Sequence, residues 1–260
     1  MVSRRLGPPA RRLAPRAGAE VWAVGALVAM AALAAGCGGS SRGQRDAMAA
    51  AQVRAAQARA IARQAGLGAD VQALLARAAR ASGVTYTVVY DQGGGQSTTV
   101  MARPPDRRID VVGASRPGST DRVIIRRSDT YVCHLDASRW RCASGVVSAP
   151  GGPFTPDAIS GTIGALAQLS QTYDFAVTHR PMLGLDASCL AASRRPGSPA
   201  DPTVGAHALL CIAPSGVILR VEDSGNADQA TSYRPSVPSG TFNLPARPTP
   251  AVTATPDGTP

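Results

Sequence analysis

The sequence predicts an α+β fold in which helices cover one face of an antiparallel sheet. Val71, Leu74, Leu75 and Ala78 recur at the i, i+3, i+4, i+7 spacing of a helix with one buried face. From Val84 onward the apolar spacing becomes two, the period of strands with one apolar and one polar face. A further helical pattern at 157–171 separates two groups of such strands. A sheet of short strands with helices before and inside it follows from these patterns.

The individual elements are expected in a simple order. A spacer at 38–44 precedes an Ala- and Gln-rich helix at 45–64, whose few large apolar side chains favour a solvated or loosely docked position. An amphipathic helix follows at 70–81. Strands are predicted at 83–91, 97–102, 107–113, 121–127, 130–135 and 139–143, then at 173–179, 185–192, 206–212, 217–222 and 229–233. The Pro- and Thr-rich residues 246–260 are expected to be disordered.

The N-terminus has the composition of an export signal. Five arginines precede an apolar run at 21–35, which is shorter than the roughly 20 residues that a membrane-spanning helix needs. The run ends in Leu33-Ala34-Ala35-Gly36-Cys37, which resembles the cleavage site of bacterial lipoprotein signal peptides. The resemblance implies a signal peptide at 1–36 and a lipid, such as palmitate, on Cys37. The protein would then be extracytoplasmic and anchored to the bacterial cell membrane, with 37–69 forming a spacer and helix.

The charge of the chain is strongly basic but dispersed. Removing residues 1–36 lowers the formal net charge from +10 to +6, because that segment holds five Arg and one Glu. All 27 basic residues are Arg, and they are scattered along the sequence, unlike the clustered footprint of a nucleic-acid-binding protein. A GC-rich genome is the simpler explanation, and a basic surface facing anionic lipid headgroups or acidic glycopolymers is the alternative. We therefore expect no nucleic-acid partner.

Four cysteines remain besides Cys37, and an even number in an exported chain implies two disulfides. Sequential pairing is the simplest of three connectivities: Cys133 with Cys142 and Cys189 with Cys211. A two-residue turn at 137–138 would place Cys133 opposite Cys142 in a non-hydrogen-bonded pair, about 4.5 Å apart at the Cα atoms, which a disulfide tolerates. A zinc site is not expected, because the chain has no CxxC motif.

The sequence favours no catalytic chemistry. His134, His179 and His207 each fall within a predicted strand, and none lies beside an acidic pair. The chain has no G-x-S-x-G elbow, phosphate-binding loop or dinucleotide motif. We therefore expect no enzyme activity, no catalytic residue, no metal and no cofactor.

The order of elements resembles the LolA/LppX/LprG-like lipoprotein-carrier superfamily over about residues 70–245. The matching features are a helix running into a first long strand (71–81, then 83–91), the antiparallel strands, the mid-domain helix and a closing Phe242-Asn243-Leu244-Pro245. The resemblance implies a strongly curved, incomplete β-barrel covered by helices. In that superfamily the concave side holds acyl chains or other apolar ligands.

The expected function is non-covalent binding or carriage of a lipid or other apolar ligand at the cell envelope. The membrane would be contacted through the N-terminal lipid, and a lipid or lipoprotein would be the ligand; the sequence does not specify an oligomeric state. The alternatives are an envelope interaction or sensor lipoprotein without a cavity and, third, an envelope hydrolase. The alternative role of the candidate lining residues is to fill a compact core. These residues are Tyr86, Val88, Val100, Ile109, Val111, Val123, Ile125, Tyr131, Phe175, Val177, Leu209, Leu219 and Val221.

Overall fold

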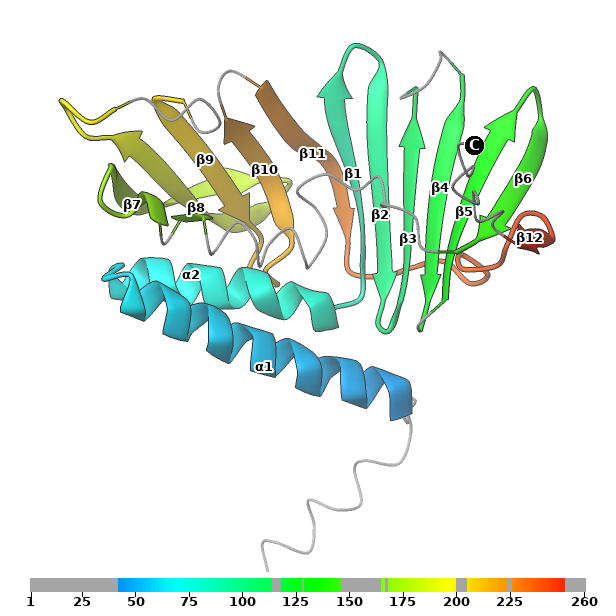
Figure 1. The fold of residues 1–260 in the computed structure, drawn as a ribbon, viewed down its shortest axis with the longest axis horizontal. Coiled ribbons are helices and arrows are strands. Elements are labelled where there is room, and N and C mark those ends of the chain that lie inside the picture. The colour runs from blue at the N-terminus through cyan, green and yellow to red at the C-terminus, as the bar shows by residue number, and fades with distance from the viewer. Residues whose placement is uncertain are drawn as a thin grey trace, which may run out of the picture. The chain divides into compact units, whose positions relative to one another are not determined.

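Two helices begin the described part of the chain. The computed structural model describes residues 42–113, 118–127, 129–145, 165–166, 168–199, 205–223 and 226–250. Helix α1 (Arg42–Gln64) and helix α2 (Ala69–Arg80) lie side by side, and the short helix η1 (Ala81–Gly83) leads into the sheet (Figure 1). Gly66 ends the turn of α1 with a φ of 72°, a left-handed conformation that glycine adopts without a steric penalty.

Helix α1 packs on α2 through a stripe of small residues. Ala51, Ala55, Ala58 and Ala62 are its buried residues. The expectation of a solvated or loosely docked helix is therefore wrong: alanines supply little apolar area each, but their small size permits close approach of the two helices. Among the described residues, no helix is both long and apolar enough to cross a membrane.

The strands form one open sheet. Its order is β12-β6-β5-β4-β3-β2-β1-β11-β10-β9-β8-β7, and neighbours are antiparallel except β12 with β6. We call β1–β6 the first wing and β7–β11 the second wing; the pairing of β1 with β11 joins them (Figure 1). The bounds of the strands are β1 Tyr86–Gly93, β2 Gln96–Arg103, β3 Asp106–Val112, β4 Thr120–Arg126, β5 Asp129–Asp136, β6 Arg139–Ser144, β7 Tyr173–Met182, β8 Leu185–Arg194, β9 His207–Ile212, β10 Ile218–Asp223, β11 Asn226–Arg234 and β12 Pro248–Pro250.

The α+β class and the antiparallel strands match the sequence prediction, with two differences in extent. The signal peptide, Cys37 and residues 38–41 of the spacer lie outside the described residues, as does most of the helix expected at 157–171. Residues 42–44, expected in the spacer, instead form the start of α1. Residues 165, 166, 168 and 169 of that helix are helical. Residues 248–250, expected in a disordered tail, instead pair with Cys142, Ala143 and Ser144 as strand β12.

Successive side chains along each strand point to opposite sides, which gives the sheet two faces. Val88, Val100 and Ile109 share a core with the helices, and we call their side the inner face. The residues that alternate with these, including Arg108 and Asp110, lie on the other side of the sheet, which we call the outer face. The core thus lies between the inner face and the helical pair, as the amphipathic pattern of α2 predicts.

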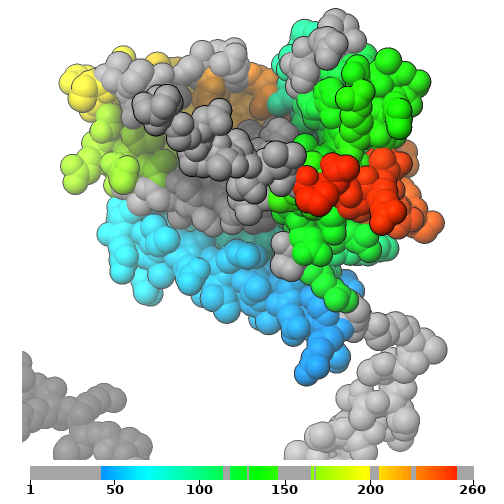
Figure 2. All heavy atoms as spheres, turned by 45° about the vertical axis from the view of Figure 1, so that its right-hand side comes forward, coloured from blue at the N-terminus to red at the C-terminus, as the bar shows by residue number. Residues whose placement is uncertain are grey.

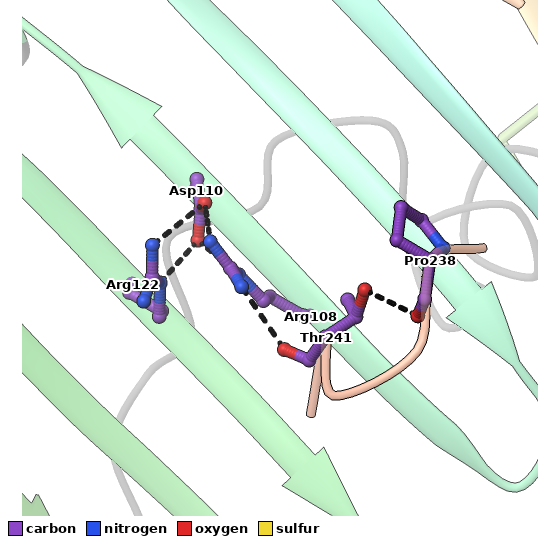
Figure 3. Close-up of polar contacts among 5 residues, drawn as sticks. All are labelled: Arg108, Asp110, Arg122, Pro238 and Thr241. Carbon is purple, nitrogen blue, oxygen red and sulfur yellow. Dashed lines mark hydrogen bonds and ion pairs between the residues drawn. The ribbon is translucent and has the colours of Figure 1, made fainter. Parts of the chain in front are cut away.

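The outer face of the first wing is covered by residues 236–250, the C-terminal segment. Asp110 accepts hydrogen bonds from Arg108 Nε at 2.9 Å and from Arg122 Nε at 2.8 Å, so its carboxylate joins β3 to β4 (Figure 3). Arg108 Nη1 also donates to the Thr241 carbonyl at 3.0 Å. Phe242 is buried beneath Arg103, whose guanidinium lies 5.0 Å from the ring centroid. In the space-filling view the end of this segment, in red, lies against the green strands of the first wing (Figure 2).

Each wing carries one disulfide between directly paired strands. Cys133 is bonded to Cys142 across β5 and β6, and Cys189 to Cys211 across β8 and β9. The sequential pairing predicted from the sequence is confirmed, including the opposition of Cys133 and Cys142 across the turn at 137–138. Their Cα atoms are 4.0 Å apart, somewhat closer than expected. Two disulfides indicate a non-reducing, extracytoplasmic setting.

Candidate ligand-binding face

The inner face carries one continuous apolar row in each wing. In the first wing, strand pairing aligns Val88 with Val100, Val100 with Ile109, Ile109 with Val123, and Val123 with Val132. In the second wing it aligns Val177, Leu190, Leu210 and Val221 in the same way. Directly paired β-branched and aliphatic side chains stabilise a sheet and present a smooth apolar surface. These rows are the geometric basis of the candidate site.

Most of the predicted lining residues lie in or against this core. Seven of them are buried members of the core, and four are partly exposed residues packed against it. The buried ones are Tyr86, Val88, Val100, Ile109, Val111, Val123 and Leu219, and the partly exposed ones are Ile125, Phe175, Val177 and Val221.

Tyr131 and Leu209 were predicted to line the same face but lie on the outer face. Tyr131 pairs with Ile124, whereas the inner row passes through Val132; Leu209 pairs with Glu222, whereas the inner row passes through Leu210. Both errors have one cause. In each case two consecutive apolar residues obscure the alternation, and the sequence alone does not show which of them faces inward.

In the structure the two misplaced residues share a face with the disulfides. Each misplaced residue lies two positions before a disulfide cysteine, Tyr131 before Cys133 and Leu209 before Cys211, so it shares the face of that disulfide. The predicted lining also omits inner-face residues that follow directly from the period of two or from strand pairing. These are Tyr90, Val132, Leu190, Leu210, Ile212 and Tyr233.

Coverage of the inner face is uneven. Val88, Val100 and Ile109 in the first wing are each 0% exposed. Val132, at the end of the same row, is only partly buried. In the second-wing row Leu190 is 2% exposed, whereas Val177, Leu210 and Val221 are only partly buried. The second-wing row therefore has apolar surface that the rest of the protein leaves partly uncovered.

The helical pair is fixed at one end of the second wing by close contacts. Arg77 Nη1 donates to Ser188 Oγ on β8 at 3.0 Å. Gly216, in the turn between β9 and β10, packs so tightly on α2 that an added Cβ would lie 2.1 Å from the Arg77 carbonyl oxygen. Only glycine fits this position, which also has a φ of 89°.

Two tyrosines and one aspartate of this face have perturbed acidity. Burial raises the pKa of both Tyr86 and Tyr90, and the positive charge of Arg107 partly opposes the rise. The hydroxyl of Tyr90 donates to the Ile218 carbonyl at 2.7 Å, which ties β1 to β10 across β11. Desolvation raises the pKa of Asp228, which pairs with Val221 at the end of the second-wing row, although a hydrogen bond from Gln92 opposes it.

The described residues also line several clefts, which are distinct from the apolar rows. One, of about 290 Å³, lies between α1 and the β2–β3 turn and includes Ile125, one of the predicted lining residues. Another, of about 310 Å³, lies between the helices and the β9–β10 turn, beside Met48 and Pro214. Neither is lined by the rows themselves.

The histidines do not form a recognisable catalytic arrangement in the described parts of the chain. His134 contacts Asp121 across β4 and β5, and both are partly buried. His179 lies 3.3 Å from Asp186, and His207 Nδ1 lies 3.3 Å from Ser193 Oγ, on exposed strand surfaces. Within the same residues, no group of three His, Cys, Asp or Glu side chains is placed to hold a metal ion.

No family model matches the chain, and no curated protein matches it either.

Proposed function

We propose that the chain is a lipid-anchored extracytoplasmic protein that binds a lipid or another apolar ligand non-covalently on the inner face of its sheet. In this proposal the sheet acts as an incomplete β-barrel of the lipoprotein-carrier kind, with the helices at its side. The observation that carries the proposal is the partly uncovered apolar row of the second wing, Val177, Leu210 and Val221, continuous with a fully buried core. An acyl chain lying on this row would gain about 0.8 kcal/mol for each buried CH₂ group.

The proposed location rests on two features of the chain. The disulfides require an oxidising setting to form and persist. The lipoprotein-like sequence before Cys37 would supply the anchor.

The anchor is tested by Cys37→Ala in the full-length chain. Metabolic labelling with palmitate should mark the wild-type protein and leave the variant unlabelled, because the thiol is the attachment point. Equal labelling of both proteins would refute lipidation at Cys37. A second variant, Cys189→Ala, leaves this thiol intact and should keep the label.

Ligand binding is tested by a matched pair of substitutions on β7. Val177 faces the inner row, whereas the next residue, Thr178, pairs with Cys189 on the outer face and is exposed. Val177→Glu should weaken binding of a fluorescent long-chain fatty acid by about tenfold or more, because a carboxylate would be desolvated beneath the chain. Thr178→Glu should leave binding unchanged.

The fatty-acid titration is made on full-length protein held in amphipol, with the melting temperature of each variant recorded. Equal affinity in wild type, Val177→Glu and Thr178→Glu, or no binding by the wild type, would overturn the proposal. The second of these results would favour an interaction or sensor protein whose core is filled by its own side chains.

A further inference from the structure

Three arginines from different parts of the fold converge on the cleft of about 290 Å³ between α1 and the β2–β3 turn. Arg54 comes from α1, Arg107 from β3, and Arg127 from the turn after β4. Asp106 is the one carboxylate in the lining of this arginine cleft. None of the three arginines forms an ion pair with a carboxylate in the described parts of the chain. The cleft therefore carries an excess of positive charge that the described residues do not neutralise.

Arg107 has an unused donor inside the fold. Its Nε atom is buried and has no hydrogen-bond partner among the described residues. A buried guanidinium N–H without an acceptor is costly, and in folded proteins such groups usually meet a partner. By contrast, Arg54 Nη1 donates to Ser82 Oγ at 3.2 Å. The unpartnered Nε identifies Arg107 as the residue of the cleft that most needs an anionic acceptor.

The arginine cleft opens beside the apolar inner face. Strand pairing aligns Ala102 with Arg107 and Arg107 with Ile125, all on that face, and all three line the cleft. Ile125 also packs against the apolar core. The influence of the Arg107 charge on Tyr86 and Tyr90 agrees with its position beside the buried residues. A molecule with its charged end among the arginines would thus have its apolar part directed along the sheet.

We propose that the arginine cleft binds the phosphate-like headgroup of an anionic amphiphile whose chain lies on the inner face. The inference rests on the proposed function and names the ligand class. Arginine suits this task because its planar fork donates parallel hydrogen bonds to phosphate oxygens and keeps its charge at any physiological pH. The volume of the cleft suits a headgroup, and Ile125, which is only partly buried, offers apolar surface to the start of the chain in the cleft itself.

The experiment compares four probes on the full-length protein in amphipol: hexadecyl phosphate, hexadecylphosphocholine, hexadecanol and inorganic phosphate. Their affinities are measured by isothermal titration calorimetry. Hexadecyl phosphate should bind at least about tenfold more tightly than hexadecanol or hexadecylphosphocholine, the lower end of what one charge-assisted hydrogen bond supplies. Inorganic phosphate should bind far more weakly than hexadecyl phosphate, because it lacks the chain.

Substitutions of single arginines show which residues cause the preference for hexadecyl phosphate over hexadecanol. Arg107→Gln should bring the affinity for hexadecyl phosphate to within about threefold of that for hexadecanol, leaving hexadecanol binding unchanged. Arg127→Gln, at an exposed turn where folding is not at risk, should reduce the preference in the same direction. Arg126→Gln is the matched control, because Arg126 is exposed on the outer face and does not line the cleft.

The outcomes separate the two proposals. If hexadecanol and hexadecyl phosphate bind equally well, the headgroup inference is wrong while the apolar site stands. If inorganic phosphate binds as tightly as hexadecyl phosphate, the cleft is a free-phosphate site and the inference is also wrong. If no probe with a chain binds the wild type, the proposed function itself fails.

Discussion

The two wings of the sheet have the same plan but differ in how completely they are covered. Each has an apolar inner row and one disulfide joining paired strands. In the first wing, the C-terminal segment covers the outer face and the central inner residues have no exposed area. In the second wing, Leu190 is buried, but Val177, Leu210 and Val221 remain partly exposed. In our proposal, the covered first wing mainly provides stability, and the partly exposed residues of the second wing provide apolar surface for the chain of a ligand.

The largest expected loss in the free energy of unfolding comes from breaking an ion pair, and it should differ between the two wings. Asp110→Asn removes the carboxylate shared by Arg108 and Arg122, whose side chains are only 17% and 14% exposed. Two largely buried guanidinium groups would lose their counter-charge, so the free energy of unfolding should fall by about 3 kcal/mol.

The matching substitution in the second wing is Asp174→Asn. Asp174 pairs with Arg195 at 2.8 Å, but their side chains are 68% and 45% exposed. Loss of this surface pair should cost less than about 1 kcal/mol. Both variants are compared with wild type by urea denaturation. Equal losses would show that the C-terminal segment and its ion pairs do not distinguish the first wing.

A smaller effect is expected from shortening one valine in each inner row. Val100→Ala leaves a cavity in the fully buried first-wing core and should cost about 2 kcal/mol. Val177→Ala, at a partly exposed position of the second wing, should cost less than about 1 kcal/mol, because fewer contacts are lost. The same denaturation assay checks both values. A greater loss at Val177 would reverse the assignment of roles to the wings.

The smallest expected effect is a pH dependence at Asp228, near the junction of the wings. Because desolvation and Asp223 raise its pKa in the folded protein, the ionised form is less favourable there than in the unfolded chain. Its contribution to stability should therefore be lost as pH rises above the unfolded value near 3.8. Asp228→Asn should raise the melting temperature slightly at pH 7 and make no difference at pH 3. A lower melting temperature for the variant at pH 7 would show that the hydrogen bond with Gln92 outweighs desolvation.

Local patterns predicted most of the strands because each hairpin encodes its own alternation. The opposition of Cys133 and Cys142 follows from counting out from a two-residue turn, and it holds in the structure. The predictions that the structure contradicts concern contacts between distant segments of the chain. The alanine stripe of α1 has too little apolar area to predict docking, and Pro248–Pro250 becomes a strand only because β6 offers an edge.

The site was harder to predict than the strands. The face of a residue such as Tyr131 or Leu209 depends on register, which a run of two apolar residues leaves undefined. The arginine cleft could not be found from the sequence at all, because Arg54, Arg107 and Arg127 meet only when α1 docks beside β3 and β4. Composition showed that the chain is rich in arginine but not where arginines converge.

The most direct test is photocrosslinking of the full-length protein in phospholipid vesicles that contain a photoactivatable fatty acid, followed by peptide mass spectrometry. We expect label on inner-face residues of the second wing, including Val177 and Val221, and loss of that label in Val177→Glu but not in Thr178→Glu. Label confined to the N-terminal residues, with none on the sheet, would contradict it.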